Sequence, residues 1–258
     1  MTWRALDRLG ESLRAAADLV LPAQCATCGE PASGALCRTC LTELRGAVPP
    51  GTGAGEAARR AAAGVPCWSA AHLEGAVRGA VTAYKDGGRR DLAAVLAPVL
   101  ATAIGRALRE DPALRRTRAQ DEQVVVVPVP PVARARRRRG DDPVGSLVVR
   151  AVRCLGDDAL VVGHVLRHVR PVDDQARLGR AARAANLAGA LDVLPGARLT
   201  VRGAACLVVD DVLTTGATVG EAARALRAAG SAHTAAATLA VRARHLTGGA
   251  LVAHREGG

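Results

Sequence analysis

The sequence predicts an α/β protein in which helices flank a parallel sheet, with a small four-cysteine module near the N-terminus. Three observations support this prediction. From Cys67 onwards, short β-branched runs alternate with helical segments rich in Ala and Leu, which is the pattern of parallel α/β domains. Four of the seven cysteines cluster between Cys25 and Cys40. Hydrophobic residues make up 49% of the 258 residues, enough for a sizeable buried core.

The chain is expected to have three parts. Residues 1–45 hold an N-terminal helix and the four-cysteine module, residues 46–66 form a linker rich in Gly, Ala and Pro, and residues 67–258 form the α/β domain. Apolar residues at three- and four-residue spacing predict an amphipathic helix over residues 1–20. Its polar face mixes acids with bases, which favours a helix that packs on protein over one that lies on a membrane.

Within the α/β domain, apolar periodicity separates helices from strands. The spacing predicts helices over residues 92–108, 147–152 and 218–229. Apolar and β-branched runs predict strands over residues 124–129, 159–165, 204–209 and 234–241. Because strands alternate with helices along the chain, we expect a parallel sheet covered by helices.

Charge and composition limit the partners that the protein can have. The formal net charge is +11 and the sequence pI about 10.7, which suits nucleic acid or polyphosphate. The abundance of Arg and Ala is equally consistent with a genome-wide composition bias. Aromatic residues make up 1% of the chain, too few for a platform that stacks single-stranded bases. We find no apolar run of ~18 residues and no signal-peptide core, so we expect a cytoplasmic protein without a membrane span.

The clustered cysteines have the spacing of a metal site. Two CxxC pairs, eight residues apart, are formed by Cys25, Cys28, Cys37 and Cys40. Four thiolates close a tetrahedral site, the geometry that structural zinc prefers, and they leave no open position for catalysis. An iron–sulfur site, two disulfides and unligated thiols are the alternatives. The other three cysteines lie in apolar or isolated settings typical of core or bystander thiols.

The stretch CLVVDDVLTTGATV has the features of a sugar-phosphate site. An apolar strand ends at Asp210 and Asp211, and a turn of small residues then leads into a helix: Thr214, Thr215, Gly216, Ala217 and Thr218. Ligands of parallel sheets bind beyond the carboxyl ends of strands, and a helix N-terminus attracts phosphate. The two carboxylates would accept hydrogen bonds from neighbouring sugar hydroxyls. The alternative is a plain strand-to-helix turn that begins with an acid.

VVDDVLTTGAT resembles the phosphoribosyl-pyrophosphate (PRPP) motif of type I phosphoribosyltransferases. Three further stretches and the cysteine cluster extend the resemblance over nearly the whole chain, to the ComF family of ComF/GntX-type proteins: AYKDGGRRDL (83–92), VVVVPVPPVARARRRRG (124–140) and HVRPVDDQARLGRAARAANLAGAL (168–191). The resemblance implies a type I phosphoribosyltransferase fold behind an N-terminal zinc finger. Some members of the family are linked to DNA uptake during natural competence.

Further candidate binding residues lie outside this motif. The arginine-rich region from Arg134 to Arg139, at the end of a predicted strand, is a candidate pyrophosphate loop because guanidinium groups bind phosphate oxygens; a solvated basic loop is the alternative. Lys85 is a candidate phosphate contact or a plain surface lysine. Four residues resemble the mobile cover of the family's active site, although Gln and Asn in loops more often cap turns: Arg170, Gln175, Arg183 and Asn186.

One segment departs from the family pattern. The family usually follows this Arg-Gly with Phe-Asn-Gln, whereas here Arg139 and Gly140 are followed by Asp141, Asp142 and Pro143. Two acids and a proline replace an aromatic residue and two amides. The resemblance therefore does not carry over to this segment a role in holding a base or a nucleotide.

Three functions agree with these residues. The first is Mg²⁺-dependent transfer of phosphoribose from PRPP to an unidentified acceptor, in which the ion bridges pyrophosphate and ribose oxygens. The second is a non-catalytic regulator that binds PRPP or a nucleotide. The third is an accessory protein that handles single-stranded DNA or binds competence proteins, with the zinc finger and basic surface as contacts.

Overall fold

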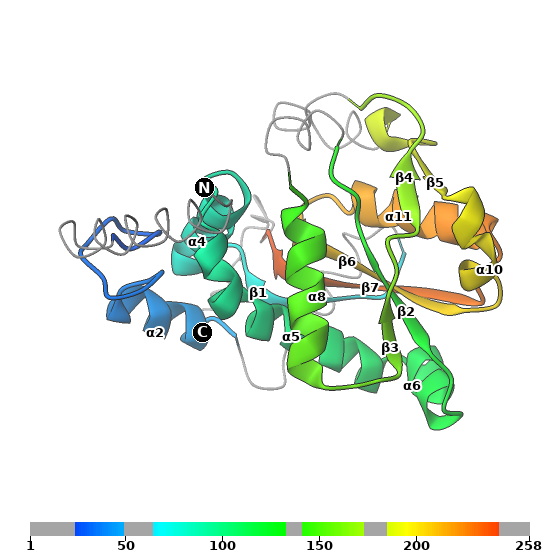
Figure 1. The fold of residues 1–258 in the computed structure, drawn as a ribbon, viewed down its shortest axis with the longest axis horizontal. Helices are drawn as coiled ribbons and strands as arrows, with labels where there is room; N and C mark the ends of the chain where they lie inside the picture. The colour runs from blue at the N-terminus through cyan, green and yellow to red at the C-terminus, as the bar shows by residue number, and fades with distance from the viewer. Residues whose placement is uncertain (1–23, 49–63, 133–140, 173–184, 243–258) are drawn as a thin grey trace, which may run out of the picture.

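The computed structural model describes residues 24–48, 64–132, 141–172 and 185–242. The helix expected over residues 1–20 and most of the expected linker lie outside these ranges. The described chain forms an α/β fold with a five-stranded sheet and a separate two-stranded sheet (Figure 1). The expected fold class, helices around a parallel sheet with an N-terminal four-cysteine cluster, is therefore confirmed.

The five-stranded sheet has the order β1-β7-β6-β2-β3, and each neighbouring pair is parallel. Its strands are β1 (Cys67–His72), β2 (Val124–Pro128), β3 (Leu160–Val162), β6 (Ala205–Leu213) and β7 (His233–Val241). The antiparallel two-stranded sheet is formed by β4 (Leu166–His168) and β5 (Leu191–Val193). The predicted strands correspond to β2, β3, β6 and β7, although β3 is shorter and β6 longer than expected.

The helices connect and cover these strands. The longer helices are α2 (Arg38–Gly46), α4 (Gly75–Lys85), α5 (Ala93–Glu110), α6 (Pro112–Ala119), α8 (Pro143–Leu155) and α11 (Ala217–Ala228). Short helical turns are η1 (Arg90–Leu92), η3 (Pro195–Ala197) and α10 (Arg198–Val201). Helix α8 begins earlier than the expected residue 147, because Asp142 caps its first turn and Pro143 takes the first helical position.

Side chains of the large sheet alternate between two hydrophobic cores. Leu207 and Val209 of β6 belong to the larger core, which also contains buried residues of α4, α5 and α8. Cys206 and Val208 belong to the second core, which contains the apolar face of α11. This alternation follows from the two-residue period of a strand, and it gives each face of the sheet its own helical cover.

One helical segment is long and apolar enough to cross a membrane by length and composition, although the sequence analysis found no such run. It spans Arg90–Glu110, and 67% of its most apolar window is buried inside the protein. Helix α5 packs against β1, β7 and α8, which explains its apolar composition as that of a core helix.

The four-cysteine module lies against α4, where α2 and α4 are side by side (Figure 1). Leu44 of α2 is almost fully buried and shares the larger core with Val77 and Ala80 of α4. The module therefore adds apolar surface to the core of the α/β domain.

Candidate functional site

The two acids of the motif lie within β6. The strand continues past the expected end at Val209, through Asp210 and Asp211 to Leu213, and it pairs with β7 at Asp210, Val212 and Leu213. The predicted boundary was wrong because backbone hydrogen bonds to β7 extend the strand beyond its apolar run.

Asp210 and Asp211 therefore point to opposite faces of the sheet, as neighbouring strand residues do. Asp211 is buried on the face covered by α4 and α5, whereas Asp210 is half-buried on the face of α11. From the sequence we expected both carboxylates to accept hydrogen bonds from the same pair of sugar hydroxyls. That expectation did not include their opposite orientations. The two acids have different surroundings and are suited to different roles.

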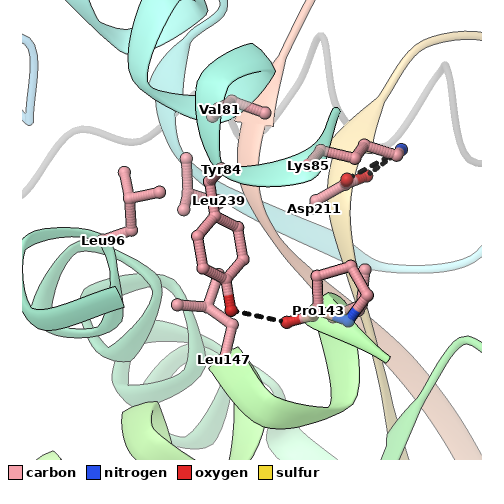
Figure 2. A pocket seen from close by; sticks show the side chains of 9 residues that line it. Val81, Tyr84, Lys85, Leu96, Pro143, Leu147, Asp211 and Leu239 are labelled. Atoms are coloured by element: carbon pink, nitrogen blue, oxygen red, sulfur yellow. Dashed lines mark hydrogen bonds and ion pairs between the residues drawn. The ribbon is translucent and has the colours of Figure 1, made fainter. Parts of the chain in front are cut away.

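Asp211 is paired with Lys85, the last residue of α4 (Figure 2). The Lys85 Nζ lies 2.7 Å from Oδ2 and 3.1 Å from Oδ1 of Asp211, whose side chain is only 8% exposed. The pocket beside them has a volume of about 10 Å³, room for roughly one water molecule. Protein side chains therefore fill most of the space on this side of Asp211, and Lys85 is the partner of the acid there.

Charge and burial oppose each other in this cluster. Burial disfavours the charged ammonium of Lys85, but the carboxylates of Asp211 and Asp210 outweigh burial and raise the pKa of the lysine. Burial, followed by the neighbouring charge of Asp211, raises the pKa of Asp210 to about 7, while Lys85 acts in the opposite direction. Functional sites often contain a group whose pKa is shifted towards neutrality, and Asp210 is such a group, close to the turn at residues 214–218.

A row of polar side chains crosses the sheet next to Asp210. Asp210 is in register with Thr238 of β7, which is in register with Ser69 of β1. The hydroxyls of Ser69 and Thr238 are fully buried and lie 2.6 Å apart. Nearby, burial and the charge of Asp210 raise the pKa of the Cys67 thiol to about 12, so this thiol stays protonated. This row cannot be recognised from the sequence, because its members lie far apart in the chain.

The turn after β6 has the backbone that a phosphate loop needs. Gly216 has a φ of 78°, in the left-handed region, and occupies the N-cap position of α11. The N–H groups of the first helical turn and the positive end of the helix dipole face this turn. One of these groups, the Ala217 N–H, makes a long bond of 3.4 Å to Thr215 Oγ1. The loop thus offers donors to an anion, with Thr214 and Thr218 beside it.

The segment that departs from the family pattern has structural roles in this chain. The Arg90 guanidinium binds the Asp141 carboxylate in a bidentate manner, at 2.5 and 3.1 Å. Arg90 also lies over the Tyr84 ring, 5.2 Å from its centroid. The Tyr84 hydroxyl donates to the Pro143 carbonyl at 2.8 Å (Figure 2), and Asp142 caps α8. The bond to Pro143 therefore attaches the start of α8 to α4, and Asp141 attaches it to η1, beside Lys85.

The expected cover residues are described only in part. Arg170 donates to the backbone carbonyls of Asn186 and Ala188, at 3.0 and 2.7 Å, so its guanidinium joins two parts of the chain. Gln175 and Arg183 lie outside the described residues, as does Arg139 of the candidate pyrophosphate loop. Their roles stay predictions.

The two-stranded sheet is attached to the helix that follows the phosphate-type loop. Glu221 of α11 is buried and accepts a hydrogen bond from the Leu191 N–H of β5 at 3.0 Å. Arg224 pairs with Glu221 at 2.8 Å and donates to the Leu191 carbonyl at 2.7 Å. Burial disfavours the charged carboxylate, but the bonds from Arg224 and Leu191 lower the pKa of Glu221. This pair fixes β5 relative to α11.

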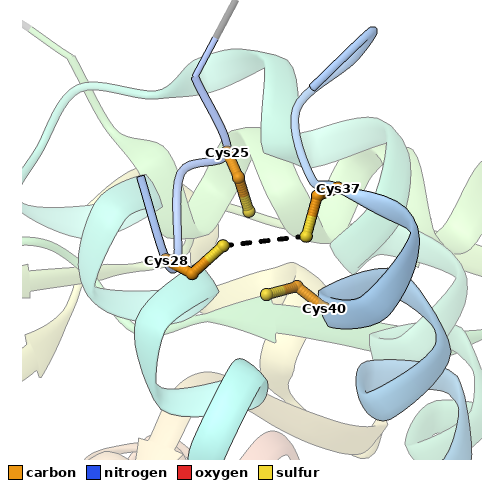
Figure 3. Close-up of side chains that lie close together, drawn as sticks. All are labelled: Cys25, Cys28, Cys37 and Cys40. Atoms are coloured by element: carbon orange, nitrogen blue, oxygen red, sulfur yellow. Dashed lines mark hydrogen bonds between the residues drawn. The ribbon is translucent and has the colours of Figure 1, made fainter. Parts of the chain in front are cut away.

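The four sulfurs of the cysteine module converge on one point (Figure 3). All four Sγ atoms lie within 4.8 Å of one another, and those of Cys28 and Cys37 are 3.7 Å apart. Metal–sulfur bonds of about 2.3 Å in a tetrahedron place sulfurs about 3.8 Å apart, so the geometry fits a zinc ion. None of the cysteines in the described residues forms a disulfide.

The local backbone prepares Cys25 for a metal. Burial raises the pKa of its thiol, but bonds from the backbone of Cys28, Cys37 and Thr27 outweigh burial and lower it to about 6. Metals bind the thiolate, so this environment favours binding. Burial and the neighbouring sulfurs raise the pKa of Cys40, as expected where four thiols share one small volume without a cation.

Comparison with known proteins supports part of these interpretations. A family model described as the phosphoribosyl transferase domain matches residues 174–248, which include β6, the turn at Gly216 and α11. The match supports a phosphoribosyltransferase-like chain. No curated protein matches the sequence significantly. The resemblance to the ComF family, carried by stretches outside residues 174–248 as well, stays a prediction.

Proposed function

We propose that the chain binds PRPP or a related ribose 5-phosphate at the carboxyl end of β6. The proposal rests on three features that follow one another along the chain: Asp210 near the end of β6, Gly216 in the left-handed region, and the N-terminus of α11. The 5-phosphate would accept hydrogen bonds from the turn and the first helical N–H groups. The match to the phosphoribosyl transferase domain covers these residues and supports the same ligand class.

We assign different roles to the two acids. Asp210, half-buried beside the loop, would accept hydrogen bonds from the ribose hydroxyls. Asp211 would hold Lys85 so that a positive charge stays close to the bound phosphoribose. A direct contact between Lys85 and phosphate would require the ammonium to turn away from Asp211, and this contact stays a prediction.

The proposed reaction is transfer of phosphoribose to an acceptor. The bond between ribose C1 and pyrophosphate breaks, the pyrophosphate leaves with the electron pair, and the acceptor forms a new bond to C1. The Asp210 carboxylate offers the oxygen ligand that Mg²⁺ prefers, and one or two carboxylates plus substrate phosphates are its usual protein site. When bound, the ion neutralises charge on the departing pyrophosphate. The carboxylate of Asp210 would also stabilise positive charge that develops on the sugar.

Calorimetry with PRPP, with and without Mg²⁺, tests the binding site. We expect Asp210→Asn to weaken binding by about 10–100-fold, because a hydrogen bond to a charged group contributes about 1.5–3 kcal/mol. Asp158→Asn is a suitable control, because this exposed acid precedes β3 at the opposite end of the sheet. Wild-type protein that binds neither PRPP nor ribose 5-phosphate would disprove the proposal.

Pyrophosphate release separates the enzyme from the non-catalytic regulator. With PRPP, Mg²⁺ and a panel of bases, release above the rate of the Asp210→Asn variant would indicate transfer. Binding without release for every base would favour the regulator.

The resemblance to the ComF family is the reason to test for DNA handling. Single-stranded DNA binding that weakens linearly in a log–log plot against salt would support it, because arginine contacts release counterions. A salt-independent signal would count against it.

A further inference from the structure

The four-cysteine module contacts α4 at its beginning. Glu43 of α2 accepts a hydrogen bond from the Ala76 N–H at 2.9 Å, within the first turn of α4. Glu74, at the N-cap position of α4, makes no capping bond with its own side chain. A Cβ on Gly75 would lie 1.9 Å from the same Glu43 oxygen, so glycine leaves the space that this contact needs. The module thus provides the cap that α4 lacks.

The module also contacts the middle of α4 and the residues after its end. The methyl group of Thr27 lies 2.4 Å from where a Cβ on Gly79 would be, so the module packs directly on the helix backbone. Arg89 donates to the Gln24 carbonyl at 3.0 Å and to the Ala35 carbonyl at 3.5 Å. These contacts fix α4 along its whole length.

The residues that make these contacts are close to the metal ligands in sequence. Gln24 and Thr27 flank Cys25, Ala35 is two residues before Cys37, and Glu43 follows Cys40 by three residues on α2. Residues three apart on a helix share a face. Because a bound ion would fix all four sulfurs, it would also fix the groups that contact α4.

The other end of α4 reaches the candidate site. Lys85 is its last residue, and the Lys85 ammonium lies 2.7 Å from Asp211. A helix of eleven residues is stiff, so a change in the position of its first turn moves its last turn as well.

We propose that Glu43 and Arg89 are positioning residues through which the metal-loaded four-cysteine module holds Lys85 against Asp211. Loss of the metal would then loosen the pair even though the ligands lie in a different part of the chain. The consequence for ribose-phosphate affinity rests on the proposed function, but the contact itself does not.

The test uses the fact that Lys85 is the only lysine in the sequence. Reductive methylation with ¹³C-formaldehyde labels a single side-chain amine, and its rate reports how often the ammonium leaves Asp211. We expect Glu43→Gln and Arg89→Gln to raise this rate severalfold with zinc content unchanged. Glu74→Gln is the matched control, because it alters a glutamate at the same helix end that makes no capping bond, and it should leave the rate unchanged.

Zinc removal from the wild-type chain tests the metal directly and needs no variant to fold. We expect a chelator to raise the methylation rate of Lys85 by about tenfold, the size expected for loss of about 1.4 kcal/mol, and added zinc to restore the original rate. An unchanged rate after zinc removal, or a rise that zinc does not reverse, would overturn the proposal. No ribose phosphate is present in the assay, so its result is independent of whether the chain binds PRPP.

Discussion

Replacement of Lys85 by methionine would leave the Asp211 carboxylate buried without its charged partner, with the Val212 N–H still donating to it. Removal of one member of a fully buried ion pair costs about 3–5 kcal/mol. The Asp211 side chain is 8% exposed but that of Lys85 is 40% exposed, so water screens the pair in part. We therefore expect Lys85→Met to lower the free energy of unfolding by about 2 kcal/mol. In a domain of this size the melting temperature should fall by about 4–8 °C.

A double-mutant cycle with Asp211→Asn isolates the pair. The free energies of unfolding of the wild type, Lys85→Met, Asp211→Asn and the double variant are measured by urea denaturation near pH 7. We expect a coupling energy of about 2 kcal/mol, and effects that add to within about 0.5 kcal/mol would refute the ion pair. The pKa of Lys85 is raised above its ordinary value of 10.5, so the stabilisation is complete below pH 10.5 and is lost as the pH rises through the raised pKa.

The remaining predictions concern the candidate site, the metal and the start of α8. Binding of PRPP should strengthen as the pH rises through about 7, because burial raises the pKa of Asp210 to this value and the carboxylate accepts hydrogen bonds from sugar hydroxyls more strongly than the protonated acid does. Calorimetry from pH 6 to 8 checks this, and a dependence that persists in Asp210→Asn would contradict it. Metal analysis of the wild type should find one zinc per chain, which Cys37→Ser should abolish and substitution of the exposed Cys154 should not. Asp142→Ala removes the cap bond to the Gly145 N–H and should lower the free energy of unfolding by about 1 kcal/mol, measured by urea denaturation; an equal midpoint would show that the cap contributes nothing.

The central strands could be predicted because they are buried on both faces. The Val-rich run at 124–129 and the Thr- and Ala-rich run at 234–241 form β2 and β7 within one residue of the expected bounds. A strand that packs against helices on both sides is apolar over its whole length, so composition alone indicates it.

The end of β6 could not be predicted in the same way. Apolar composition ends at Val209, but β6 runs to Leu213 because β7 offers backbone partners up to Val241. Composition reports side-chain burial, whereas strand length follows from backbone pairing. With the strand expected to end at Val209, the opposite orientations of Asp210 and Asp211 could not be predicted.

The pairing of Lys85 with Asp211 could not be predicted from the sequence either. The two residues are 126 positions apart, and each belongs to a motif that has its own explanation. The cysteine spacing, by contrast, is a local pattern, and it correctly indicated sulfurs that converge. A site formed by one local motif can therefore be predicted from the sequence. A contact between two motifs, such as that of Lys85 with Asp211, depends on how α4 packs against the sheet.

The strand order has a consequence for how the chain folds as it is synthesised. Among the strands that the structure describes, β1 pairs only with β7, which lies more than 160 residues later, as the bond between Ser69 and Thr238 illustrates. The ribosome must synthesise β7 before β1 has a neighbouring strand. The edge of β6 that faces away from β2 also stays unpaired until then. A nascent chain that already contains both CxxC pairs and Asp210 would still lack β7 between β1 and β6, so the candidate site should mature only after β7 has been synthesised.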